Sequence, residues 1–213
     1  MENTNLLYEA ILKGNLQQAV QVTQEAIEAN IDPQKLINEQ MIKAMETIGD
    51  RFEKQQAFVP ELLMAARAMK GSLDLLRPLL AGSSDQKTDK IVIGTVKGDM
   101  HDIGKNLVAS MLEGCGFEII NLGVDVSAEK FIETVKSSGA KLVGLSALLT
   151  TTMTTMKEIV DAFNASGIRD QVKIMVGGAP VSQQFADSIG ADGYSNNANT
   201  AVALAKKLVS SMS

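Results

Sequence analysis

The segment "KIVIGTVKGDMHDIGKNLVAS", residues 90–110, passes from an apolar run through a glycine-flanked polar loop into a helical pattern. Residues 90–96 are mostly apolar and β-branched, which is typical of a strand buried on both faces of a sheet. The apolar spacing from residue 104 onward favours a helix. A strand, a loop and a helix in succession form the repeating unit of a parallel sheet, so this segment indicates an α/β fold.

The same alternation repeats through the second half of the chain. Helical patterns separate further short apolar runs, which cover residues 117–123, 141–148, 172–178 and, more weakly, 192–196. With the first run they predict five parallel strands that carry helices on both faces. We therefore expect a doubly wound, flavodoxin-like (Rossmann-like) sheet of five strands.

The first part of the chain has a helical pattern instead. Apolar residues recur at helical spacing within residues 16–26, 36–48 and 62–80. Asp32 is a candidate N-cap, and Pro33 suits the first position of the helix that follows. These features predict a four-helix bundle in front of the sheet.

The segment "AGSSDQKTDK", residues 81–90, is small, polar and charged. Such a composition between two regular patterns is typical of an interdomain linker. We therefore expect a helical domain over residues 1–84 and a sheet domain over residues 85–213.

Composition excludes several function classes. The chain is 45% hydrophobic and 21% charged, as in ordinary globular proteins, and its net charge of −5 argues against a nucleic-acid partner. It has no run of about 18 apolar residues that would span a membrane, and no secretion signal opens it. A single cysteine, Cys115, makes no internal disulfide. We expect a cytoplasmic protein without a membrane partner.

His101, the only histidine, lies in the loop after the first predicted strand. The glycines at 94, 98 and 104 do not form the dinucleotide fingerprint G-x-G-x-x-G, and a Walker loop is absent. Catalytic zinc usually takes three protein ligands, often histidines, which a lone His101 with Asp99 does not supply.

A lone imidazole can serve as the single axial ligand of a metal that a macrocycle already holds. Such a histidine needs a partner on its other ring nitrogen, commonly a carboxylate, and Asp99 is placed for this role. Gly104 would leave room for a bulky ligand. Ligands of open α/β sheets bind beyond the carboxyl ends of the strands, where this loop, "SALLTTT" (146–152) and "GGAP" (177–180) are all expected.

These segments together resemble the cobalamin-binding domains of corrinoid-dependent methyltransferase systems and of cobalamin-dependent methionine synthase. The family signature, D-x-H-x-x-G followed by S-x-L and then G-G, is matched in order and spacing. The matching residues are Asp99, His101, Gly104, Ser146, Leu148, Gly177 and Gly178. The helical part also resembles the cap domain that precedes the corrinoid domain in this family.

The resemblance implies a role for each matched position. His101 would be the lower axial ligand of cobalt, and Asp99 would bond the other ring nitrogen, with Thr152 as the next hydroxyl of the relay. Further cofactor-binding positions, which include the pocket for the displaced nucleotide tail, would be Asp102, Gly104, Ser146, Leu148, Gly177 and Gly178. The cap contacts over the corrin would be Phe52, Val59 and Leu62.

The resemblance further implies a methyl carrier without catalytic residues of its own. Its cofactor would be cobalamin or a related corrinoid, as methylcobalamin or cob(I)alamin, base-off and histidine-on. A substrate-specific methyltransferase would load it from a methylamine, a betaine, methanol or a methoxyaromatic. An acceptor methyltransferase specific for coenzyme M or tetrahydrofolate would unload it, and a reductive activation protein would restore it.

Two other classes share parts of the signature. A cobalamin-dependent regulator or sensor is the main alternative, but it normally needs an output domain, for which we find neither room nor charge. An adenosylcobalamin mutase small subunit would share the histidine motif and need not carry the helical cap. The sequence therefore favours the methyl carrier.

Overall fold

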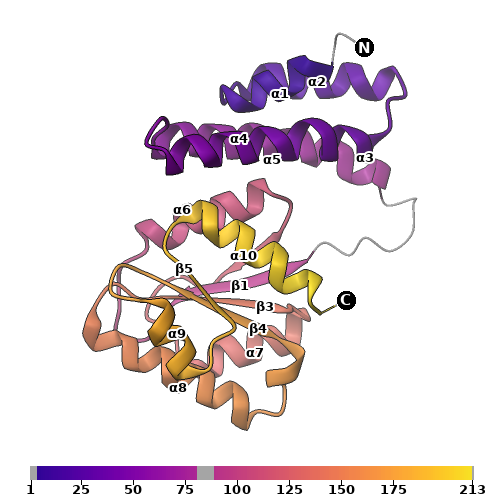
Figure 1. Ribbon diagram of the computed structural model, residues 1–213. Helices are drawn as coiled ribbons and strands as arrows, with labels where there is room; N and C mark the ends of the chain where they lie inside the picture. Colours follow the sequence, from indigo (N-terminus) through magenta and orange to yellow (C-terminus); the bar gives the residue numbers. More distant parts are fainter. Residues whose placement is uncertain (1–3, 81–88, 213) are drawn as a thin grey trace. The chain divides into compact units, whose positions relative to one another are not determined.

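The computed structural model describes residues 4–80 and 89–212 (Figure 1). Contacts divide the chain into two units, made mainly of the residues up to Thr88 and of those from Asp89 onward. The predicted boundary between residues 84 and 85 lies outside the described residues, as does most of the predicted linker. Lys90, the last residue assigned to that linker, is the first residue of a strand.

The first unit is helical. Asp32 caps a helix by accepting a hydrogen bond from the Gln34 N–H at 2.9 Å, and Pro33 is the first residue of that helix, as the sequence predicted. This helix continues through a π-helical turn directly into the following α-helix, so the three segments form one continuous helix over residues 33–53. The elements are α1 (Thr4–Leu12), α2 (Leu16–Glu28), α3 (Pro33–Leu36), the π-turn (Ile37–Met41), α4 (Ile42–Glu53) and α5 (Val59–Leu80).

Apolar stripes hold the helical unit together. α2 packs along α5, and α1 packs against α2 and α4. The side chains of Leu7, Ile11, Leu36, Met41 and Ile48 are almost completely removed from solvent. Since burying one such side chain contributes roughly 1.5–3 kcal/mol, this interior is the main source of stability of the helical unit.

The second unit contains a five-stranded, all-parallel sheet in the order β2-β1-β3-β4-β5. This is the flavodoxin-like order, so the predicted fold class is confirmed. The strands are β1 (Lys90–Thr95), β2 (Glu118–Asn121), β3 (Leu142–Ser146), β4 (Lys173–Gly177) and β5 (Gly193–Ser195). The helices are α6 (Ile103–Gly114), α7 (Ala128–Ser138), α8 (Met153–Ala165), α9 (Gln183–Ile189) and α10 (Ala198–Ser210).

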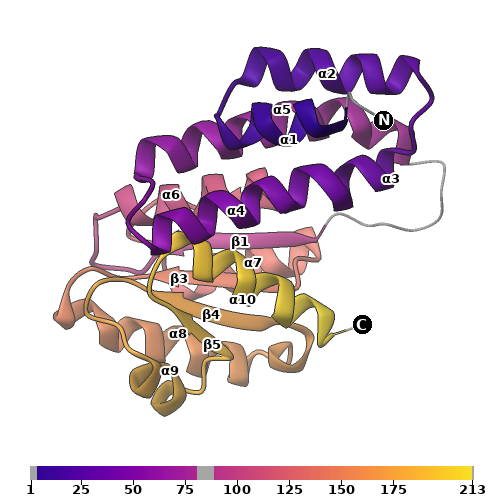
Figure 2. The same ribbon diagram turned by 45° about the horizontal axis from the view of Figure 1, so that its top comes forward.

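Helices cover both faces of this sheet. Figures 1 and 2 show α6 and α10 on one face and α7, α8 and α9 on the other. On the latter face, Val92, Val143 and Val176 of the strands belong to the same buried cluster as Phe131 of α7 and Phe163 of α8. The strands β1, β3 and β4, which lie inside the sheet, are buried on both sides, which explains why their sequences are nearly continuous apolar runs.

The third strand is shorter than its apolar run. The sequence predicted a strand over residues 141–148, whereas β3 ends at Ser146. The main-chain N–H groups of Leu148 and Leu149 turn away from the sheet and donate hydrogen bonds to a side chain of another loop. A short 3₁₀ turn, Thr150–Thr152, then leads into α8.

Candidate functional site

The carboxyl ends of four strands form a level edge. Thr95, Ser146, Gly177 and Ser195 are register neighbours along this edge, on β1, β3, β4 and β5 respectively. The chain leaves β1 for α6 on one face and leaves β3 for α8 on the opposite face, so the strand order reverses between them. Ligands of doubly wound sheets bind at such a reversal, and two of the predicted segments meet there.

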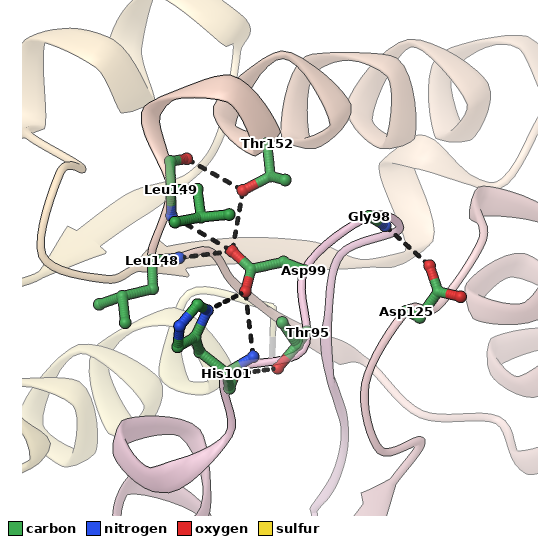
Figure 3. A network of polar contacts seen from close by, with 8 residues as sticks. All are labelled: Thr95, Gly98, Asp99, His101, Asp125, Leu148, Leu149 and Thr152. Atoms are coloured by element: carbon green, nitrogen blue, oxygen red, sulfur yellow. Dashed lines mark hydrogen bonds and ion pairs between the residues drawn. The ribbon is translucent and has the colours of Figure 1, made fainter.

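Asp99 lies at the centre of this reversal (Figure 3). Asp99 belongs to the loop after β1 and is completely buried (0% exposed). Its Oδ2 accepts hydrogen bonds from three groups of the loop after β3. The donors are the Leu148 N–H at 2.8 Å, the Leu149 N–H at 3.3 Å and the Thr152 hydroxyl at 2.8 Å.

These donors keep the Asp99 carboxyl ionised. Burial by itself raises the pKa of Asp99, because it removes the charge from water. The main-chain N–H groups of Leu148 and His101, the His101 ring and the Thr152 hydroxyl outweigh that effect and hold the pKa of this carboxyl well below its usual range. Asp99 is therefore a buried anion near neutral pH.

The other carboxylate oxygen of Asp99 faces His101. Oδ1 accepts a hydrogen bond from the His101 main-chain N–H at 3.0 Å and lies 2.7 Å from the ring Nδ1. An ionised carboxylate has no proton to donate, so Nδ1 carries the hydrogen of this bond. In the neutral ring the lone pair is then on Nε2, and the side chain is 51% exposed. This arrangement offers Nε2 as a nitrogen ligand.

The main chain of the loop is held as well. The Thr95 hydroxyl, at the end of β1, donates to the His101 carbonyl at 2.9 Å. On the side of β2, the Gly98 N–H donates to Asp125 Oδ1 at 2.7 Å (Figure 3). The Asp125 N–H donates to the Asp99 carbonyl at 3.1 Å. The loop is thus bonded to both of its neighbouring loops.

The predicted relay residue Thr152 does lie beside Asp99. Its hydroxyl is within 2.8 Å of Asp99 Oδ2 and within 2.9 Å of the Leu149 carbonyl oxygen. A hydroxyl has a single hydrogen, so it donates to one of these acceptors at a time. The buried charge makes the carboxylate the stronger acceptor.

The three predicted glycines differ in what surrounds them. A Cβ on Gly104 would meet no atom within 4 Å, so space is open at this position. A Cβ on Gly178, whose φ is +132°, would lie 1.8 Å from the Ala147 carbonyl oxygen, and one on Gly177 would lie 3.1 Å from the Ser195 carbonyl oxygen. The fold itself therefore requires Gly178, whereas no contact among the described residues requires a glycine at position 104.

Asp102 belongs to a polar cluster at the start of α6. Its Oδ2 accepts a hydrogen bond from the Asn106 side chain at 2.9 Å. Lys105, only 3% exposed, donates to the side-chain oxygens of Asn106 at 2.7 Å and Asn121 at 2.8 Å. Burial lowers the pKa of the Lys105 ammonium, and the charge of Asp102 opposes this effect. The cluster ties α6 to the end of β2.

The surface around His101 is apolar. Met100 directly precedes His101 and Ile103 begins α6 two residues after it, and both side chains are exposed, Ile103 to 89%. Leu148 and Leu149, whose N–H groups bind Asp99, expose their side chains as well, and Ser146 below them is half-buried. Apolar side chains are normally buried away from water, so a group of exposed ones is characteristic of a binding site.

This donor set fits a metal that arrives inside a macrocycle. Among residues 4–80 and 89–212, no group of three or more His, Cys, Asp or Glu side chains could hold a bare metal ion. One oriented nitrogen donor, an apolar surface around it and open space at Gly104 instead suit a large planar group that brings its own metal.

The predicted cap residues differ in exposure. Within the helical unit, Phe52 is half-buried, Val59 is exposed and Leu62 is completely buried. The neighbouring apolar side chains of Phe58, Leu63 and Met64 are exposed and were not singled out by the sequence. Contact of Phe52, Val59 and Leu62 with a corrin stays a prediction.

The sequence did not single out Thr95, Asp125, Lys105, Ile103 and Leu149. Ile103 carried a signal, because an apolar residue at the end of a polar loop is unusual. Asp125 and Lys105 carried none, since their partners Gly98 and Asn121 lie far away along the chain.

Comparison with known proteins agrees with this site. The chain matches two family models, both described as B12 binding domains, over residues 89–203 and 4–77. It is 39% identical to a corrinoid protein of Desulfitobacterium hafniense over 95% of both chains. It is 42% identical to a dimethylamine corrinoid protein of Methanosarcina barkeri, again over 95% of both. Fold and site thus define a corrinoid-binding protein.

Solved structures extend the likeness. A cobalamin-binding protein from Desulfitobacterium hafniense superposes with a TM-score of 0.82 at 33% identity, over 98% of this chain and 99% of that one. A chain of the methanol:cobalamin methyltransferase complex of Methanosarcina barkeri gives a TM-score of 0.82 at 30% identity, over 98% and 80%. This protein belongs to the family of corrinoid, B12-binding proteins of methyltransferase systems.

No helix within the described residues combines the length and the apolar character needed to cross a membrane.

Proposed function

We propose that this protein binds its corrinoid in the base-off, histidine-on form and carries a methyl group on the cobalt between two methyltransferases. The observation that carries the proposal is the 2.7 Å contact of Asp99 Oδ1 with His101 Nδ1, which leaves Nε2 as the available donor on a half-exposed ring. When bound, the corrin supplies the chemistry, because its cobalt accepts and releases the methyl group.

The residues of the chain have three tasks in this proposal. His101 offers one nitrogen that can bind to the cobalt or leave it. Asp99 keeps the ring in the tautomer that presents Nε2, and its charge stabilises a partial positive charge on a ligated imidazole. The donors on Asp99, including Thr152, limit how strongly it attracts the ring proton. The strength of the axial bond therefore depends on the donors to Asp99 as well as on His101 itself.

We further propose the remaining contacts of the cofactor. Gly104 gives clearance for the corrin, and Ser146 and Leu148 contact the displaced nucleotide tail beyond the ends of the strands. Gly177 and Gly178 lie at the same edge and let the main chain approach that tail. Asp102 shapes the rim of the site through its contact with Asn106.

A partner methyltransferase supplies the methyl group in this proposal, as the names of relatives suggest. Relatives are named for trimethylamine and dimethylamine, and one solved relative is part of a methanol:cobalamin methyltransferase complex. We propose that a methyltransferase of this kind is the partner that transfers the methyl group to this protein. An acceptor methyltransferase and a reductive activation protein complete the cycle.

The unique histidine makes the axial ligand directly testable. Protein labelled with ¹⁵N-histidine carries the label only at residue 101. After reconstitution with cobalamin and reduction to cobalt(II), the electron paramagnetic resonance signal should show nitrogen coupling that changes from triplets to doublets upon labelling. His101→Ala should lose this coupling. Triplets that persist in labelled protein would show that the cofactor's own base is the ligand and overturn the proposal.

Methyl transfer requires a second test. Reduced, reconstituted protein should gain the methyl-cobalt absorption spectrum when a partner methyltransferase and its methylated substrate are added together, and neither alone should suffice. Trimethylamine, dimethylamine and methanol, each with its own methyltransferase, serve as the substrate panel. A protein that binds cobalamin through His101 yet is methylated by no such pair would contradict the carrier role.

A further inference from the structure

We propose that Asp125, in the loop between β2 and α7, is a positioning residue that fixes the loop on which His101 is presented. The inference rests on the proposed role of His101 as the axial ligand. Asp125 does not belong to the motif by which the chain resembles its family. Its hydrogen bonds are to Gly98 and Asp99, whereas the His101 ring is bonded to Asp99.

Asp125 binds the loop at two points. Its carboxylate accepts a hydrogen bond from the Gly98 N–H at 2.7 Å (Figure 3). Its own N–H donates to the Asp99 carbonyl at 3.1 Å. The first bond has an ionised acceptor, which makes it stronger than a bond between neutral groups. The two bonds lie on either side of the peptide that joins Gly98 to Asp99, so they restrain its rotation.

The main chain at this contact adopts an uncommon conformation. Asp125 has a φ of +55°, and its partner Gly98 has a φ of +87°. Left-handed values cost free energy for most residues, and Asp, Asn and Gly tolerate them best. A conformation of this kind persists where surrounding contacts determine it, and the two hydrogen bonds supply these contacts.

The effect on His101 passes through Asp99. The loop after β3 holds the Asp99 carboxylate, and Asp125, in the loop after β2, holds the Asp99 main chain. Because β1 lies between β2 and β3, the two neighbouring loops restrain Asp99 from opposite sides. The orientation of the hydrogen bond that His101 Nδ1 donates to Asp99 Oδ1 therefore depends on both restraints.

Two substitutions separate the side-chain contact from the backbone conformation. Asp125→Gly removes the acceptor for Gly98 and accepts a positive φ without strain. Asp125→Asn keeps a side-chain oxygen as acceptor and also tolerates a positive φ, so it is the matched control. Neither substitution changes a residue that we assign to the cofactor site.

The primary readout uses full-length protein without cofactor, labelled with ¹⁵N-histidine. Wild-type protein and Asp125→Asn should show one imidazole with hydrogen fixed on Nδ1. In Asp125→Gly the Nδ1 and Nε2 shifts should move toward the averaged values of a free imidazole at the same pH. Identical ¹⁵N shifts in Asp125→Gly and wild-type protein, with the variant folded by circular dichroism, would overturn the inference.

A measurement on the wild-type protein needs no variant. Gly98 is exposed, yet its N–H should exchange with solvent deuterium roughly tenfold more slowly than in an unstructured peptide because of its bond to Asp125. Unprotected exchange at Gly98 would contradict the contact. These readouts contain no cobalt, so they stand even if the nitrogen-coupling experiment on His101 fails, and a failure here leaves the proposed axial ligand intact.

Discussion

The Asp99 carboxylate lies 2.7 Å from the His101 ring nitrogen Nδ1, although Asp99 is completely buried and the His101 side chain is half-exposed. This pair connects the interior of the sheet unit to its surface. A buried anion at one end and an open nitrogen at the other allow the protein to adjust a ligand bond from inside the fold.

The contribution of Asp99 to stability should depend on pH. Because folding lowers the pKa of Asp99, its contribution is complete above the unfolded pKa, about 3.9, and is lost as the pH falls below that value toward the folded pKa. Asp99→Asn should reduce the free energy of unfolding by about 1.5–3 kcal/mol at pH 7. Urea unfolding of both proteins at pH 7 and at pH 3 checks this, and an equal difference at the two pH values would contradict it.

Thr152 should stabilise the Asp99 charge through its hydroxyl. Thr152→Val keeps the volume but removes the donor, so it should cost about 1 kcal/mol of unfolding free energy. Because Asp99 then attracts the ring proton more strongly, the substitution should strengthen nitrogen ligation of cobalt. Thr152→Ser keeps the hydroxyl and should resemble the wild-type protein in ligation. Urea unfolding and cobalt(II) spectra report the two effects, and a serine variant that behaves like the valine variant would argue against the hydroxyl.

Gly104 and Gly178 should respond in opposite ways to alanine. Gly104→Ala meets no protein atom, so stability should stay the same or rise by up to about 1 kcal/mol, while corrinoid affinity falls if this position gives clearance to the ligand. Gly178→Ala should destabilise the fold by on the order of 3 kcal/mol, because its Cβ would overlap the Ala147 carbonyl. Thermal unfolding and cobalamin titration separate the two cases. A Gly104→Ala protein with unchanged affinity would remove Gly104 from the site.

Lys105 should stabilise the start of α6 rather than contact a ligand. Lys105→Met retains most of the apolar stem but leaves the side-chain oxygens of the exposed residues Asn106 and Asn121 without this donor, so it should cost about 1 kcal/mol. Urea unfolding measures the loss. Cobalamin affinity of the folded variant should remain within a few-fold of wild type, and a much larger loss at full stability would place Lys105 in the site.

The strand and helix pattern could be predicted because it depends on local periodicity. Runs such as residues 90–96 are mostly apolar because helices cover both faces of the sheet, and that pattern is visible in a single sequence. The ends of the strands were less predictable. β3 ends at Ser146, and the N–H groups of Leu148 and Leu149 beyond it donate to Asp99, a residue that no local pattern connects with them.

By itself, the sequence determined the two kinds of fold, their order and the unique histidine with its aspartate two positions earlier. Only the tertiary structure decided which groups surround that aspartate. The donors to its carboxylate come from the loop after β3, and the donor to its main-chain carbonyl is the N–H of Asp125, in the loop after β2. Hydrogen bonds between loops depend on strand order and register, which arise from packing of the whole sheet and leave no periodic trace along the chain.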